Sequence, residues 1–399
     1  MKIKDIILRE VFDSRGESVL EVGIEDYLGH KFIAQNPYGA SRGSNEASVF
    51  SCERAKKILN GGLAREIIKK NFGSVRNFDH ILFNFDGTAR KEKIGGNLAL
   101  GLSVAFARGL AYERGQLLWE LLNEEFFFSR PFRSYPLIFS NLINGGAHAD
   151  NNLDFQEYIV IVKITGSVKD TIEKLIDFYK KLGILLKKRF SKKELVIGDE
   201  GGYSLMFENN FEPIDILGNL IEKERLMSKY GLGLDAAASN FYSNSRYSFE
   251  GKRISKKDLY EKYLEYFRKS KFLFSIEDPF NERDIQDFKN LSIELSDKLI
   301  IGDDLTTTNS AAILALAKEK AINGVIIKPN QIGSVTESCE AIKVAHENGV
   351  KCIISHRSGE TEDNFIINLA RASGAEGVKI GAPVRERLSK FNELIRTYN

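Results

Sequence analysis

Residues 351–364 have the sequence KCIISHRSGETEDN. Their short apolar run, residues 352–354, leads within two positions to His356, Arg357 and Ser358, and not to the Gly, Pro or Asn that commonly follow a strand. An imidazole, a guanidinium and a hydroxyl side by side suit an anion such as a phosphate. We therefore predict a strand whose carboxyl end faces an anion-binding site.

Further apolar runs in the same part of the chain carry a charged residue at or near their ends. They are GLGLD (231–235), FLFSIED (272–278), LIIGDD (299–304), GVIIK (324–328) and GVKIG (377–381). Most recur about every 25 residues, with helical sequence such as SAAILALAKEKA (310–321) between them. Parallel strands with helical crossovers predict an α/β protein with a (β/α)8-type barrel, in which chemistry collects at the carboxyl ends of the strands.

The first third of the chain has a different texture. Two strand-like runs, IILREVFDS (6–14) and VLEVGIED (19–26), precede the loop NPYGASRGSNEAS (36–48), and residues 52–125 have helical periodicity. We therefore predict an N-terminal α+β domain over residues 1–130 and the barrel over residues 131–399. Pro131 and Pro136 bracket this boundary.

The composition excludes several classes of protein. The 57 Lys and Arg residues nearly balance the 55 Asp and Glu residues, which argues against a nucleic-acid or membrane-surface binder. Three widely spaced cysteines (Cys52, Cys339 and Cys352) form no disulfide or zinc pattern. No apolar run is long enough for a membrane span, and the N-terminus lacks the apolar segment of a signal peptide. We expect a cytoplasmic protein with a small-molecule substrate.

Three acids, Asp235, Glu277 and Asp303, stand at the ends of successive runs. Carboxylates that converge in one pocket stay ionised only beside a cation, and hard oxygen ligands favour Mg²⁺. Each acid taken alone could equally cap a helix or lie in a surface loop. Lys328 ends the next run and is either a surface residue or a base. A base near neutral pH needs its pKa lowered by burial or by a nearby divalent cation.

Two segments upstream of these runs offer further candidates. In LINGGAHADNNLDFQEY (142–158), His148 follows a Gly-Gly turn and Glu157 ends an alternating, strand-like stretch. In VIGDEGGY (196–203), Asp199 and Glu200 follow a short apolar run, and the paired glycines suggest backbone that passes close to a ligand. A purely structural role for His148 or Glu157 is the alternative.

Ten motifs along nearly the whole chain together resemble the enolase family. They are DSRG (13–16), GAS (39–41), FDGT (85–88), INGGAHADNN (143–152), QE (156–157), GDEGGY (198–203), SIEDP (275–279), GDDL (302–305), IKPNQIGS (327–334) and SHRSGETEDN (355–364). The resemblance implies an enolase-type barrel with an early antiparallel strand and an N-terminal capping domain. It also implies a homodimer or higher homo-oligomer, and dehydration of 2-phospho-D-glycerate to phosphoenolpyruvate with two Mg²⁺ ions per active site.

The resemblance also implies a role for each candidate residue. Lys328 would remove the proton next to the substrate carboxylate, and Glu200, assisted by Glu157, would expel the hydroxyl as water. This acid role leads us to expect a raised pKa for Glu200. The implied metal ligands are Asp235, Glu277, Asp303 and Ser41. The implied substrate contacts are His148, His356, Arg357, Ser358 and Lys379.

The chain departs from the family pattern mainly in the loop that bears Ser41. The loop has Tyr38 and Arg42 where the family usually has Ser and Thr, and Asn240 replaces a familiar Glu. Two alternatives therefore stay open. One is a paralogue that acts on a related phosphorylated or phosphonylated hydroxy acid, and the other is a non-catalytic binding or scaffold role.

Overall fold

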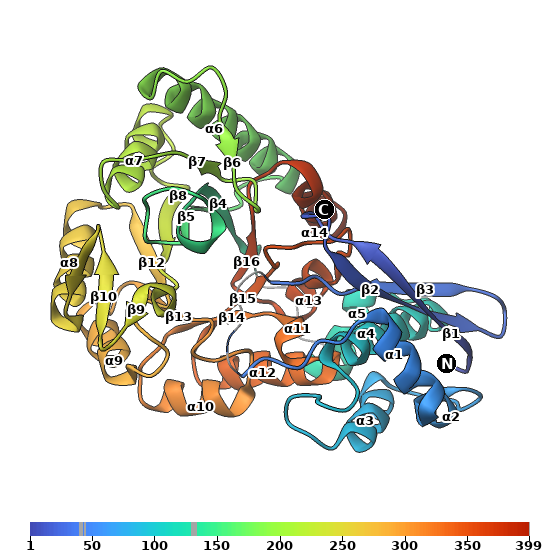
Figure 1. Cartoon of the computed structure of the whole chain (residues 1–399). Coiled ribbons are helices and arrows are strands. Elements are labelled where there is room, and N and C mark those ends of the chain that lie inside the picture. Colours follow the sequence, from blue (N-terminus) through green and yellow to red (C-terminus); the bar gives the residue numbers. More distant parts are fainter. Residues whose placement is uncertain (40–42, 44, 129–133, 399) are drawn as a thin grey trace.

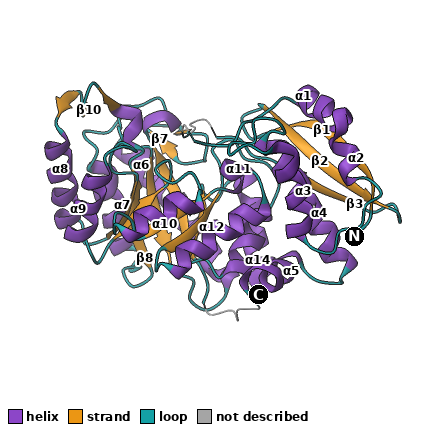
Figure 2. Ribbon diagram, turned by 90° about the horizontal axis from the view of Figure 1, so that it is seen from below, coloured by secondary structure: helices purple, strands orange, loops and turns teal. Residues whose placement is uncertain are grey.

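The computed structural model describes residues 1–39, 43, 45–128 and 134–398, and these residues form two parts that lie side by side (Figure 1 and Figure 2). The smaller part begins with an antiparallel sheet of order β1-β2-β3. Its strands are β1 Ile3–Phe12, β2 Ser18–Asp26 and β3 Lys31–Gln35. The central strand, β2, is buried over most of its length.

Helices complete the smaller part, as the periodicity of residues 52–125 predicts. They are α1 Cys52–Ile58, α2 Ala64–Ile67, α3 Val75–Asp86, α4 Gly96–Glu113 and α5 Leu118–Phe127. The long helix α4 is buried almost throughout and packs on β2 and β3. The close approach requires a glycine, because a Cβ atom at Gly101 would lie 2.4 Å from Cγ2 of Val22.

Within the described residues, eight strands close the barrel of the larger part, with β16 pairing back onto β4. They are β4 Leu137–Asn144, β5 Glu157–Val162, β8 Tyr230–Asp235, β12 Leu273–Glu277, β13 Leu299–Gly302, β14 Gly324–Ile327, β15 Lys351–Ser355 and β16 Gly377–Ile380. All six runs that the sequence singled out are barrel strands. The predicted fold class is therefore confirmed.

Helices follow the strands and cover the outside of the barrel (Figure 1). They are α6 Val168–Arg189, α7 Glu212–Lys223, α8 Lys256–Lys269, α9 Ile285–Glu294, α10 Ser310–Lys318, α11 Pro329–Ile332, α12 Val335–Glu347, α13 Phe365–Ser373 and α14 Leu388–Tyr398. Short strands in the crossovers are β6 Val196–Ile197, β7 Tyr203–Ser204, β9 Tyr242–Ser243, β10 Arg246–Phe249 and β11 Lys252–Ile254.

One barrel strand runs against the others. β5 is antiparallel to both of its neighbours, β4 and β8, whereas the remaining barrel pairs are parallel. This agrees with the early antiparallel strand that the resemblance implies. The 25-residue period of the later runs does not contain this information, because it describes parallel β/α units.

Buried polar contacts join the two parts. The guanidinium of Arg108 in α4 forms a bidentate pair with the Asp363 carboxylate, at 2.7 and 2.8 Å. The buried Asp79 of α3 accepts a hydrogen bond from the Thr336 amide at the start of α12, at 3.0 Å. The predicted boundary between residues 130 and 131, including Pro131, lies outside the described residues and stays a prediction. No helix of the described chain is both long enough and apolar enough to cross a membrane.

Candidate active site

The carboxyl ends of the parallel strands bring five predicted residues to one mouth of the barrel. Asp235 and Glu277 are the last residues of β8 and β12, Asp303 directly follows β13, Lys328 directly follows β14, and Lys379 lies in β16. All three acids are at most 7% exposed. None of them is a surface-loop residue, so that alternative is excluded.

Glu157 reaches the same mouth by a different route. It opens β5 and does not end a strand, so the sequence interpretation was wrong on this point. Because β5 is antiparallel, its first residue lies level with the last residues of its neighbours. The register pairs Glu157 with Asp235, and Asp235 with Glu277, so three carboxylates stand side by side.

Lysine ammonium groups neutralise these carboxylates. Nζ of Lys379 lies 2.9 Å from Asp235 Oδ2, 2.8 Å from Glu277 Oε2 and 3.2 Å from Glu157 Oε2. Burial opposes the charge of Lys379, but Asp235 and the other two acids outweigh it and raise the pKa of Lys379 well above its usual range. Burial and the nearby Asp235 charge raise the pKa of Glu277.

Lys328 is held by the third acid. Its ammonium donates to Asp303 Oδ2, and Gln331 Nε2 donates to Asp303 Oδ1 at 3.2 Å. Burial, Arg357 and Lys379 lower the pKa of Lys328, but the Asp303 charge raises it further, and the net shift is upward. A base requires a lowered pKa. The pKa of Lys328 is therefore not lowered as long as Asp303 pairs with it.

A second group gathers around Glu200. His148 lies in a short turn after β4, and its Nδ1 atom is 3.7 Å from Glu157 Oε1 and 3.6 Å from Glu200 Oε1. His356 Nε2 lies 3.6 Å from the same Glu200 oxygen. Ligand atoms of His148, Glu157 and Glu200 all lie within 4.8 Å of one another, so these residues could also hold a metal ion. Burial lowers the pKa of both histidines.

The protonation of the two glutamates differs from the sequence expectation. Burial raises the pKa of Glu157 well above its usual range, and the charge of Glu200 adds to this. Burial also opposes ionisation of Glu200, but His356, His148 and cations further away outweigh it and lower its pKa. The pKa of Glu200 is therefore shifted downward here and not upward as the sequence led us to expect, whereas the pKa of Glu157 is shifted upward.

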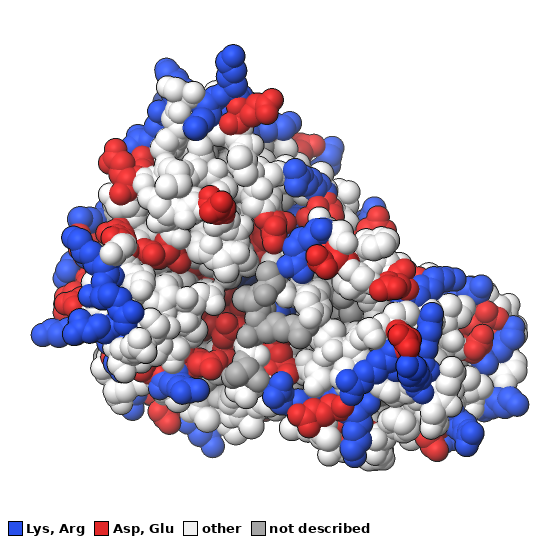
Figure 3. Space-filling model, in the orientation of Figure 1, with Lys and Arg blue, Asp and Glu red and all other residues white. Residues whose placement is uncertain are grey.

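These groups line one small cavity at the mouth of the barrel. Its lining residues are Gly39, His148, Gln156, Glu157, Glu200, Lys328, Ser355, His356, Arg357, Ser358 and Lys379. In the space-filling view, acidic side chains are visible in the recess near the centre of the molecule (Figure 3). Ser41 and Arg42 lie outside the described residues, and the metal-binding role of Ser41 stays a prediction.

Arg357 is paired with an acid that the sequence interpretation missed. Its Nη1 and Nη2 atoms lie 3.2 Å from Oε2 and Oε1 of Glu46. Both side chains are at most 7% exposed. Gly39 passes so close that a Cβ atom there would lie 1.9 Å from Arg357 Nη2, which explains why a glycine occupies this position. The group that we expected to bind phosphate therefore already has an anionic partner.

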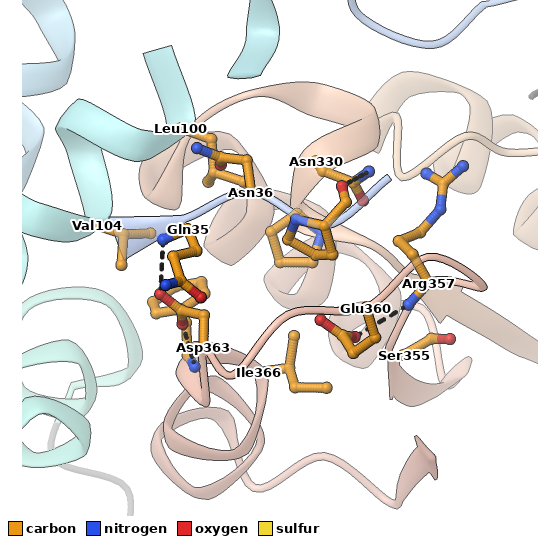
Figure 4. A pocket seen from close by; sticks show the side chains of 13 residues that line it. Gln35, Asn36, Leu100, Val104, Asn330, Ser355, Arg357, Glu360, Asp363 and Ile366 are labelled. Atoms are coloured by element: carbon orange, nitrogen blue, oxygen red, sulfur yellow. Dashed lines mark hydrogen bonds between the residues drawn. The ribbon is translucent and has the colours of Figure 1, made fainter. Parts of the chain in front are cut away.

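Hydrogen bonds within the loop and from Arg387 hold the loop after β15 in place. A neighbouring cavity separates part of this loop from residues 35–37, and the Arg357 guanidinium is turned away from Gln35 and Asp363 (Figure 4). The Arg357 amide donates to Glu360 Oε2 at 3.2 Å. From the opposite side, the fully buried Arg387 donates from Nη2 to the carbonyl oxygens of Arg357 and Ser358, at 3.2 and 2.7 Å.

Several residues that shape the site escaped the sequence interpretation. Gln156 and Gln331 stood inside recognised motifs but received no role, although they donate to Asp235 and Asp303. Glu46 and Arg387 carried no signal, because Glu46 lies in the polar loop NPYGASRGSNEAS (36–48) and Arg387 lies in a charged segment typical of a solvated surface.

Fold and site together define a (β/α)-barrel protein with an acid–base site of buried lysines, histidines and carboxylates. Two family models match the chain. "Enolase, N-terminal domain" covers residues 3–122, and "Enolase, C-terminal TIM barrel domain" covers residues 133–399.

Curated relatives agree with the family models. The enolase of Sulfolobus acidocaldarius is 36% identical over 393 residues, which are 97% of this chain and 93% of the relative. The enolase of Aeropyrum pernix is 36% identical, over 98% of this chain and 92% of its own length. The enolase of Ehrlichia chaffeensis is 37% identical, over 98% of this chain and 95% of its own length. This chain belongs to the enolase family.

Proposed function

We propose that this chain catalyses the dehydration of 2-phospho-D-glycerate to phosphoenolpyruvate and is thus a hydro-lyase. The observation that carries the proposal is the single buried cavity that Lys328, Lys379, Arg357 and the Glu157–Glu200 pair share. It combines a candidate base, a candidate acid and cationic groups for a doubly anionic substrate. Names of relatives at about 35% identity over nearly the full length support the same activity.

The buried acids fit a divalent cation. Asp235 and Glu277 share one lysine ammonium, and Asp303 takes another, so each carboxylate requires a positive partner. Oxygen ligands of this kind suit Mg²⁺, and we propose Mg²⁺ at Asp235, Glu277 and Asp303, with Ser41 contributing to a second ion. When bound, Mg²⁺ supplies positive charge that stabilises the substrate carboxylate while its α-proton is lost.

Lys328 is the proposed base. Its pKa is raised because Asp303 is its ion-pair partner. Lys328 loses this stabilisation of its protonated form once Asp303 is engaged elsewhere. Arg357 and Lys379, which already act to lower its pKa, then prevail. The unprotonated amine can accept the α-proton of the substrate.

Glu157 and Glu200 are the proposed acid pair. A leaving hydroxide needs a proton, and burial raises the pKa of the Glu157 carboxyl, which favours its protonated form. His148 Nδ1 lies between the two glutamates, 3.7 Å from Oε1 of Glu157 and 3.6 Å from Oε1 of Glu200. His356, Arg357 and Ser358 are proposed to bind the phosphate, and Lys379 to bind the substrate carboxylate.

The resemblance supports three further proposals. We propose that the chain divides into domains at residues 130 and 131, that it forms a homodimer or a higher homo-oligomer, and that it works in the cytoplasm. Sedimentation velocity over a range of protein concentrations would test the oligomeric state, and a monomer at all concentrations would refute that proposal.

Turnover of 2-phospho-D-glycerate, followed by the absorbance of phosphoenolpyruvate, tests the proposed activity. We expect Lys328→Ala to fold normally and to lose turnover, and EDTA to abolish it in the unsubstituted protein. Lys351→Ala is a matched control, because Lys351 is an exposed lysine at the opposite end of the barrel. Full turnover in Lys328→Ala would refute the proposal. Normal Mg²⁺ binding without turnover in the unsubstituted protein would favour the paralogue, and loss of both would favour a scaffold role.

A further inference from the structure

A second group of metal-ligating side chains lies at the opposite end of the barrel. His346 is in the last turn of α12, Cys352 is the second residue of β15, and Glu376 directly precedes β16. A ring nitrogen of His346, the sulfur of Cys352 and a carboxylate oxygen of Glu376 all lie within 4.8 Å of one another. None of these residues has a part in the proposed dehydration.

This group is separate from the active site. Cys352 stands near the start of β15, whereas Ser355 ends the strand at the active-site mouth. Three residues of a strand span roughly 10 Å. The group therefore lies at the amino-terminal face of the barrel, where residues contribute to stability more than to catalysis.

Hydrogen bonds already orient the carboxylate and the imidazole, and the thiol of Cys352 faces the carbonyl oxygen of Ile342 at 3.9 Å. Glu376 Oε2 accepts from the Cys352 amide at 2.8 Å and lies 3.3 Å from His346 Nε2. Partial burial opposes ionisation of Glu376, but the hydrogen bonds from His346 and from the Cys352 amide hold its pKa below the usual range. The hydrogen bond from the Cys352 amide fixes the direction of the Glu376 carboxylate. Metal ligands in proteins are commonly positioned by such contacts outside the coordination shell. The ligands also stand on packed elements, because α12 packs on β15 and β15 pairs with β16.

The donor set selects a particular kind of ion. A sulfur, an imidazole nitrogen and a carboxylate oxygen suit Zn²⁺, whereas Mg²⁺ and Ca²⁺ prefer oxygen ligands alone. Three protein ligands and a water molecule complete a tetrahedral shell. An ion can enter from the Glu376 side, because this side chain is 42% exposed and lines the cavity at the amino-terminal face of the barrel.

We propose that His346, Cys352 and Glu376 bind Zn²⁺ and thereby clamp the end of α12 to β15 and β16. On binding, the thiol releases its proton to water. The neutral imidazole moves its one proton from Nε2 to Nδ1, so that Nε2 offers its lone pair to the ion. The ion then lies between Nε2 and the carboxylate oxygen, where the Nε2 proton lay before binding.

Cobalt(II) titration of the full chain at saturating Mg²⁺ tests this proposal. A thiolate ligand gives Co²⁺ a charge-transfer absorption that an oxygen-and-nitrogen site cannot give, so the active site does not contribute. We expect this band in the unsubstituted protein and its loss in Cys352→Ser. It should persist in Cys52→Ser, since Cys52 lies in α1 of the smaller part. Added Zn²⁺ should displace Co²⁺ and remove the charge-transfer band.

His346→Ala keeps the test decisive if loss of the buried thiol disturbs folding. His346 is only partly buried, and its replacement should leave turnover with Mg²⁺ unchanged while lowering Zn²⁺ affinity at least about tenfold. Zn²⁺ should raise the midpoint of thermal unfolding of the unsubstituted protein but not of His346→Ala. A missing charge-transfer band, a band that survives Cys352→Ser, or equal Zn²⁺ affinity in His346→Ala would each overturn the proposal.

Discussion

From the Glu46–Arg357 pair we predict that Glu46→Gln lowers the stability of the free protein and raises its affinity for phosphate. Glu46 offers both carboxylate oxygens to the Arg357 guanidinium at 3.2 Å, and both groups are buried. Glu46→Gln keeps the shape but removes the charge. Because Glu46→Gln removes the carboxylate that pairs with the buried Arg357 guanidinium, we expect the free energy of unfolding to fall by about 3 kcal/mol, the lower end of the range for a broken buried pair.

A phosphate that binds Arg357 supplies the missing negative charge, so part of this loss should return as affinity. If about 2 kcal/mol returns, inorganic phosphate should bind Glu46→Gln roughly 30-fold more tightly than the unsubstituted protein. Urea denaturation with and without phosphate measures both quantities in one experiment, because a ligand of the native state raises the apparent stability.

Glu337→Gln provides the matched control. Glu337 pairs with Lys91 at 2.8 Å, at the joint between the two parts and outside the cavity of the active site. Its replacement should also lower stability, because it removes the carboxylate that pairs with the buried Lys91, but it should not change phosphate affinity. If Glu46→Gln binds phosphate no more tightly than the unsubstituted protein, then Glu46 does not compete with phosphate for Arg357, and the reasoning is refuted.

Three further predictions concern buried charges. Lys379→Met should destabilise the protein by about 3–5 kcal/mol without metal, because it strips three acids of their cation, and Mg²⁺ should restore part of this in denaturation assays. Burial raises the pKa of Asp79 to about 6 against an ordinary 3.8. The folded protein therefore holds this proton more tightly, and about 3 kcal/mol of stability should be lost as pH rises from about 4 to about 6. Asp79→Asn should abolish this loss, and an unchanged pH profile would contradict the assignment. Arg387→Lys keeps the charge but not the forked donor to the carbonyls of residues 357 and 358, so kcat/KM should fall by about 100-fold with a smaller effect on the melting temperature.

The barrel could be predicted because most of its strands have a recognisable sequence pattern. Runs such as GVIIK and CIISH are short, apolar and buried on both faces, and each ends in a polar residue at a regular interval. The sequence pattern does not show whether a strand is parallel or antiparallel to its neighbours. The run of β5, EYIVIV (157–162), is equally apolar, and only its pairing shows that Glu157 begins the strand at the mouth of the barrel.

Site residues could be predicted from the sequence where a charged or polar residue ends a barrel strand. Contacts between segments that are far apart in the sequence could not be predicted. Arg357 and Glu46 are 311 positions apart, and neither segment indicates the other. Arg387 and Lys390 lie in RERLSKFNELIR (385–396), which has the composition of a solvated helix. Both are fully buried because they bind the loop after β15, Arg387 through backbone carbonyls and Lys390 through the Thr361 carbonyl and Glu360.

Lysine ammonium groups neutralise the acids at the mouth of the barrel. Asp235, Glu277 and Asp303 would repel one another in a dry pocket, yet the ammonium groups of Lys379 and Lys328 meet them there. A cation held by these acids would take the place of the lysine ammonium groups as their partner. Lys328 and Lys379 line the same cavity as Arg357. We therefore place both lysines at the centre of the proposed chemistry, Lys328 as the proposed base and Lys379 as the proposed cation for the substrate carboxylate.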